Sequence, residues 1–144
     1  MKITNGQLFN IKNVLFRPES FMYNGDITQI MAVRNALKFN VEELQKADQV
    51  LQSLIQDILK ELQNEYVAAN KATKEDDNFK IKTGYEEDFN KDFQGKLDEL
   101  AVQEVELNNF QTYSKEKFDL FMEKNDGLLK EADIRILEMF IKQE

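Results

Sequence analysis

The sequence contains no cysteine and no histidine, and it has one proline in 144 residues. Without cysteine the chain has no disulfide, no thiolate zinc site and no thiol nucleophile. Without histidine it cannot supply imidazole acid–base catalysis, a serine–histidine nucleophile or a histidine metal ligand. None of the five glycines lies in a GxGxxG or GxxxxGK[ST] phosphate-binding motif. We therefore expect a protein that is not an enzyme and that needs no cofactor.

Carboxylates are the only abundant groups that remain for acid–base or metal chemistry. Adjacent pairs such as Glu42 with Glu43 point in different directions on a helix, which favours a solvated face. A calcium-loop frame that begins at Asp76 is broken by Lys80 and Ile81, where a ligand and a glycine are needed. The sequence therefore predicts no catalytic residues and no metal site.

The net charge of −8 is unevenly distributed along the chain. Residues 1–50 carry six basic and five acidic side chains, whereas residues 51–100 carry seven and twelve. Phosphate contacts supply most of the affinity of nonspecific nucleic-acid binding, so direct contact with nucleic acid is not expected. The acidity is interpreted as a means of keeping the protein soluble, and the alternative is a surface that imitates nucleic acid in a basic groove.

The sequence has little that would take it to a membrane. No apolar run approaches the ~18 residues of a membrane-spanning helix. The first residues, MKITNGQLFN, lack the apolar core of a signal peptide. We expect a single domain over residues 1–144, located in the cytoplasm, with no membrane association.

Apolar residues at steps of three and four predict one long helix, with Asp26 as its N-cap and its end near Lys71. A helix of about forty residues would be ~60 Å long. Such an apolar stripe is typical of a helical hairpin within one chain, and the alternative is a seam between copies of the chain. A second helix, from about 86 to 104, is expected to pack antiparallel against the first.

Shorter elements complete the predicted fold. Thr4 is expected to cap a first helix, Ser114 a short later helix, and residues 128–142 to form a last helix. Residues 79–82 and 105–108 alternate between apolar and polar, and we predict that these two short strands pair and clamp the base of the hairpin. The fold class is thus mainly α with a minor α+β part: a long antiparallel helical hairpin, additional short helices and a small two-stranded β element.

Four segments occur in an order that resembles a known family. They are MKITNGQLFN, AVRNALKFNVEELQK, KIKTGYEEDFNKDFQGKLDELAVQEVEL and ADIRILEMFI. The chain resembles, over nearly its full length, a family of short uncharacterised proteins from phages and prophages of Gram-positive bacteria. The resemblance implies a viral protein made in the cytoplasm of a bacterial host, and it brings no catalytic residues.

The function that these features favour is that of a small non-enzymatic phage accessory protein that binds another protein. It would inhibit or modulate a host, defence or replication factor. The alternative is a virion or assembly component, such as a tail or connector protein or chaperone, that forms a homo-oligomer through the long helix. The residues expected to contact the partner are Glu75, Asp76, Asp77, Glu86, Glu87, Asp88 and Asp92.

Overall fold

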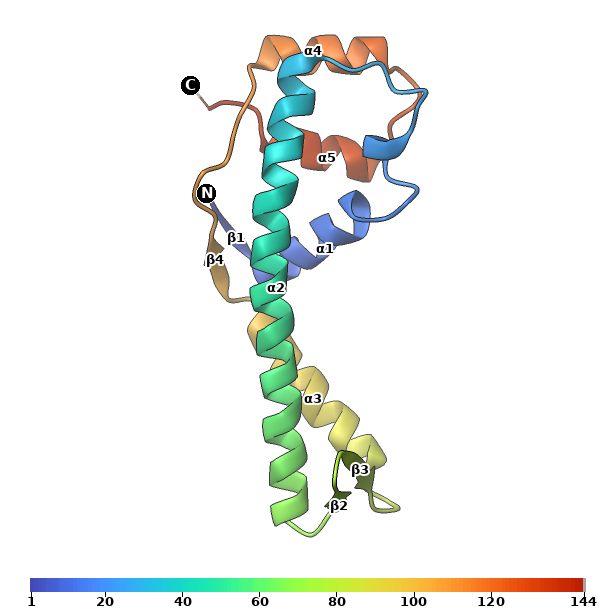
Figure 1. Ribbon diagram of the computed structural model, residues 1–144, viewed down its shortest axis with the longest axis vertical. Helices are drawn as coiled ribbons and strands as arrows, with labels where there is room; N and C mark the ends of the chain where they lie inside the picture. The colour runs from blue at the N-terminus through green and yellow to red at the C-terminus, as the bar shows by residue number, and fades with distance from the viewer. Residues whose placement is uncertain (144) are drawn as a thin grey trace. The chain divides into compact units, whose positions relative to one another are not determined.

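The structure is a computed structural model that describes residues 1–143 and is mainly α-helical with minor β structure, as the sequence predicts (Figure 1). The chain divides into two compact units. The terminal unit comprises Met1–Asp48 and the chain from Glu104 onwards, and the middle unit is Gln49–Gln103. Helix α2, Met31–Ala68, contributes residues to both. A single domain over the whole chain remains a prediction.

The terminal unit is built from helices whose caps are visible in the sequence. Helix α1, Asn5–Leu15, is capped by Thr4 as predicted, and Thr4 forms a capping box with Gln7. Helix α4, Lys115–Lys124, begins at Ser114, whose hydroxyl accepts from the Lys117 amide. Helix α5, Glu131–Met139, is shorter at both ends than the predicted helix. The largest fully buried apolar side chains of this unit are Phe121, Phe140, Leu8, Leu15, Leu44, Leu137 and Val33.

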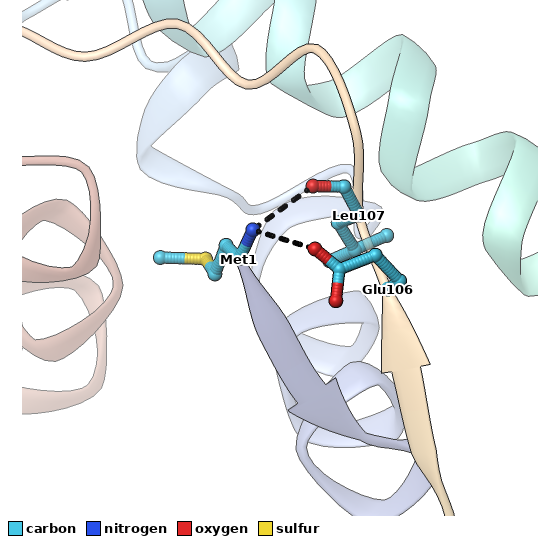
Figure 2. Close-up of polar contacts among 3 residues, drawn as sticks. All are labelled: Met1, Glu106 and Leu107. Carbon is cyan, nitrogen blue, oxygen red and sulfur yellow. Dashed lines mark hydrogen bonds and ion pairs between the residues drawn. The ribbon is translucent and has the colours of Figure 1, made fainter.

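Strand β1, Lys2–Thr4, was not predicted, and it pairs antiparallel with strand β4, Glu104–Glu106. Ile3 is buried in this pair and lies opposite Val105. The α-amino group of Met1 lies 3.4 Å from a carboxylate oxygen of Glu106 and 3.2 Å from the Leu107 carbonyl oxygen (Figure 2). The first and the later part of the sequence are thus joined by backbone pairing and by one ion pair.

The start of α2 differs from the prediction. Asp26 does not cap the helix, which begins at Met31; its amide instead donates to the side chain of Asn24 in a turn. The reason is a contact with Asn125, which comes later in the sequence. Its side chain accepts from the Thr28 amide at 2.6 Å and donates to the Thr28 carbonyl at 2.8 Å. Both backbone groups of Thr28 are thus used outside a helix, which delays the helix start. The segment between α1 and α2 also contains a 3₁₀ helix, η1, Phe21–Tyr23.

A second buried asparagine, which belongs to α2, bonds an irregular segment in the same way. The side chain of Asn40 is fully buried and bonds both backbone groups of Gln111, which lies just before α4. Its amide donates to the Gln111 carbonyl at 2.8 Å, and its oxygen accepts from the Gln111 amide at 2.9 Å. Each asparagine therefore holds an irregular segment to a helix as a neighbouring strand would hold it.

The middle unit contains the rest of α2, the strands β2, Ala72–Glu75, and β3, Asn78–Ile81, and helix α3, Glu86–Ala101. Helix α3 runs back in the direction opposite to that part of α2, so the predicted helical hairpin is confirmed here (Figure 1). The two helices touch where the ring of Tyr66 meets that of Phe89 edge to face, with centroids 5.1 Å apart. This contact lies at the end of the helical hairpin where β2 and β3 connect the two helices.

The predicted pairing of the strands is wrong. Strand β3 pairs antiparallel with β2, a strand that the sequence does not predict, and β4 pairs with β1. A hairpin with the two-residue loop Asp76–Asp77 closes at little entropic cost, whereas the predicted pair would enclose a helix and falls in two units. Asp76 has a φ of 54°, a left-handed conformation that aspartate tolerates better than most residues. The loop therefore forms without glycine.

Candidate functional site

The predicted partner-binding residues lie on the middle unit, on elements that share one small aromatic core. Its buried residues are Leu62, Tyr66, Ala72 and Phe89, and partly buried hydrophobic side chains pack against them: Leu59, Phe79, Ile81, Tyr85 and Phe93. The Phe79 and Phe89 ring centroids lie 5.5 Å apart and join β3 to α3. The β-hairpin and the first turns of α3 are therefore held together by contacts within this unit.

Three of the predicted residues form the loop end of the β-hairpin. Glu75 ends β2, pairs with Asn78 and precedes the two-residue loop of Asp76 and Asp77. All three acidic side chains are exposed. None of them makes a hydrogen bond or ion pair within residues 1–143, so their carboxylates face solvent. We call them the hairpin carboxylates.

The other four predicted residues belong to α3, and we call them the helix carboxylates. Glu86, Glu87 and Asp88 form the first turn, where negative charge stabilises the helix dipole. Glu86 accepts from the Gly84 amide at 3.0 Å, which closes the turn in front of the helix. Asp92 accepts from the Tyr66 hydroxyl at 2.6 Å and so ties α3 to α2. Two of the four thus have structural roles that the sequence does not reveal.

Lysines are interspersed with these carboxylates. Residues 70–92 contain seven acidic and five basic side chains, so the local net charge is only −2. Lys74 and Lys80 are exposed on the two strands, and the Lys71 ammonium lies 5.5 Å from the Tyr66 ring centroid and 5.6 Å from that of Tyr85. The surface is consequently a mixed one in which carboxylates project from the ends of the hairpin and helix.

The strongest electrostatic effect of this arrangement is on the pKa of the Tyr66 hydroxyl, and the sequence gives no sign of it. Burial, and then the hydrogen bond to Asp92, raise the pKa of Tyr66 to about 12. The negative charges of Asp92 and Asp88 act in the same direction. Asp92 bonds the Tyr66 hydroxyl directly, whereas Asp88, four residues earlier on α3, acts through its charge. In the terminal unit, burial likewise raises the pKa of Tyr113, whose hydroxyl donates to the Leu137 carbonyl.

We expect Tyr66 to ionise near pH 12, above the ordinary value of 10.0. Since the raised pKa favours the protonated folded form, this contribution to stability is complete below pH 10 and is lost as the pH rises towards 12. The difference between the alkaline absorbance titrations of the protein and of Tyr66→Phe isolates this ionisation. In Asp92→Asn, which keeps an accepting oxygen without the charge, the pKa of Tyr66 should fall. Ionisation of Tyr66 at the pH of a free tyrosine would contradict the assignment.

Within the described part of the chain, no three histidine, cysteine, aspartate or glutamate side chains are grouped as metal ligands. In the same residues, no helix combines the length and the apolar character needed to cross a membrane. The chemistry that the site offers is the presentation of exposed carboxylates on a packed support. The sequence matches no known family model, no curated protein and no solved structure.

Proposed function

We propose that the protein is a small, non-enzymatic phage accessory protein that acts in the cytoplasm of a bacterial host by binding another protein through the hairpin and helix carboxylates. The observation that supports this is that exposed carboxylates without partners lie on elements that are packed together. The side chains of Glu75, Asp76, Asp77 and Glu87 are exposed and make no hydrogen bond or ion pair with other residues in 1–143, while Phe79 and Phe89 hold their elements together.

Such carboxylates are suited to recognition because binding does not have to break existing ion pairs. Charges at the edge of an interface mainly accelerate association and select against partners of the same sign. A partner with a basic patch would therefore be attracted over several ångströms and then docked against the hairpin. Binding of this kind would inhibit or modulate a host, defence or replication factor without any chemical step.

The proposal predicts that neutral variants lose the partner. In one variant Glu75→Gln, Asp76→Asn and Asp77→Asn are combined, and Asn suits the left-handed backbone at 76. A second variant combines Glu87→Gln with Asp88→Asn and leaves Asp92 in place, because Asp92 bonds Tyr66. Each should weaken partner binding by about tenfold or more, largely through slower association. The measurement is affinity capture from infected host cells, quantified by mass spectrometry.

The control carries three neutral changes, as many as the first variant, on exposed acids of the terminal unit. Glu116→Gln, Glu123→Gln and Asp126→Asn remove three charges far from the hairpin in the sequence. Proteins that the original chain and this control retain equally, and that both neutral variants lose, are the expected partners. The proposal fails if the captured proteins are the same for all four baits.

The alternative, a virion or assembly component, has one supporting observation. Val50 and Leu54 lie one turn apart on α2 and remain 62% and 41% exposed. Exposed apolar side chains at this spacing suit a helix seam between copies of the chain. Light scattering of the purified protein separates the two functions, because a stable ring or larger oligomer favours assembly and a monomer or dimer favours the binding protein.

A further inference from the structure

A pocket of about 210 Å³ lies in the terminal unit, between η1, the start of α2 and α4. Its floor is apolar, since Phe21, Leu37 and Phe121 are 5%, 4% and 1% exposed. Tyr23 lines the same pocket and is 62% exposed, so its ring forms an open wall. The pocket thus combines a dry floor with an aromatic side chain that remains available to a ligand.

The charge of this pocket is opposite to that of the protein. Arg34 and Lys38 line it, one turn apart on α2, and no aspartate or glutamate among residues 1–143 does. Both side chains are exposed, and neither forms an ion pair within residues 1–143. The first turn of α2 has no acidic residue, so the positive end of the helix dipole adds to the two cations. In a chain of net charge −8, this pocket is distinguished by two cations that lie beside an apolar floor and form no ion pair within residues 1–143.

The size of the pocket limits what it can hold. Sites for small-molecule ligands have volumes of about 300–1,000 Å³. This one is about 210 Å³, which is enough for one large apolar side chain and too little for a typical cofactor. Interfaces between proteins are often anchored by a single large side chain that fills a pocket of this kind, with polar contacts around it.

We propose that this pocket binds an acidic segment of a partner protein, which inserts one phenylalanine or leucine side chain above Phe21, Leu37 and Phe121 while its flanking carboxylates pair with Arg34 and Lys38. Tyr23, which is 62% exposed, packs against the inserted side chain. The site goes beyond the proposed function: it lies in the other unit, takes the opposite charge and does not use the hairpin or helix carboxylates. It would give the protein a second binding surface.

The test uses the full chain and a blocked peptide, acetyl-Gly-Glu-Asp-Phe-Glu-Asp-Gly-amide, followed by backbone chemical shifts in NMR titrations. We expect shifts concentrated on the residues that line the pocket, with affinity that falls as salt is added. A peptide with alanine in place of phenylalanine should bind about tenfold more weakly. A peptide with lysines in place of the acids should not bind.

On the protein, the combined substitutions Arg34→Glu and Lys38→Glu should weaken binding of the peptide by at least about tenfold. Because both side chains are exposed, this variant should keep the spectrum of the folded protein elsewhere. The matched control is Lys117→Glu with Lys124→Glu, which makes the same charge change on α4 and should leave binding unchanged. Three results would overturn the proposal: no shifts at the highest peptide concentration, shifts outside the pocket, or equal binding of the lysine peptide. Concentration-dependent shifts of the pocket without peptide would overturn it too, by assigning the pocket to a second copy of the chain.

Discussion

Replacement of Asn125 by leucine will lower the free energy of unfolding by about 3 kcal/mol, because the amide and carbonyl of Thr28 lose the side chain that they bond. Asn125 is 1% exposed, so water cannot take its place without opening the structure. Leucine has nearly the same size, and the loss therefore reflects hydrogen bonds more than packing. The Phe121 carbonyl keeps a partner, because the backbone amide of Asn125 also donates to it.

Equilibrium denaturation with urea measures this change, provided that the slope of the transition stays the same. The matched control is Asn35→Leu, the same substitution at an exposed position of α2, which should change stability by less than about 0.5 kcal/mol. A loss at Asn125 no larger than that at Asn35 would mean that the bonds to Thr28 do not stabilise the fold.

The second large effect is expected for Asn40→Asp. The aspartate can still accept from the Gln111 amide, but its other oxygen faces the Gln111 carbonyl, where the asparagine donates. An ionised carboxylate that is fully buried beside a carbonyl costs several kcal/mol, and we expect a loss of about 4 kcal/mol at neutral pH. Asn40→Leu, which leaves the two Gln111 groups unpaired without adding charge, should cost about 3 kcal/mol.

The two variants are distinguished by their dependence on pH. Burial and the opposing carbonyl raise the pKa of the new aspartate in the folded state above its unfolded value of about 3.9. Its protonated form can donate to the Gln111 carbonyl, so the stability lost at neutral pH returns as the pH falls through that raised pKa. Denaturation of both variants and of the original chain at pH 4 and pH 7 measures this. A deficit of Asn40→Asp that is the same at both values would contradict the predicted geometry.

The sequence predicts those parts of the fold that depend on local signals. Ser114 marks the start of α4 because a cap needs only its own hydroxyl and an amide three residues on. The apolar spacing of α2 likewise predicts a helix of nearly the observed length. In contrast, the sequence gives no sign of the hydrogen bonds that the side chains of Asn40 and Asn125 make. Their partners lie 71 and 97 residues away, and no local pattern identifies them.

Strand pairing fails for a related physical reason. Alternation in 79–82 and 105–108 indicates extended backbone, but it does not say which edges meet. The loop at Asp76–Asp77 was missed because it contains no glycine, although aspartate can take the φ of 54° found there. All seven residues of the candidate site are exposed, and their role in partner binding stays a prediction. Their division into free carboxylates and those that bond Gly84 or Tyr66 needed the structure.

The terminal unit is made from both ends of the described sequence, and the middle unit from one uninterrupted segment. This has a consequence for the order of folding during synthesis. The Met1 amine and its Glu106 partner are 105 residues apart, so β1 must wait until the ribosome has released more than two-thirds of the chain. The middle unit has no such delay, because its strands and helices follow one another directly. The middle unit can fold while the first 48 residues still lack β4, α4 and α5. During that interval the apolar side chains of these residues lack the partners that bury them, and the unfinished core is prone to aggregation.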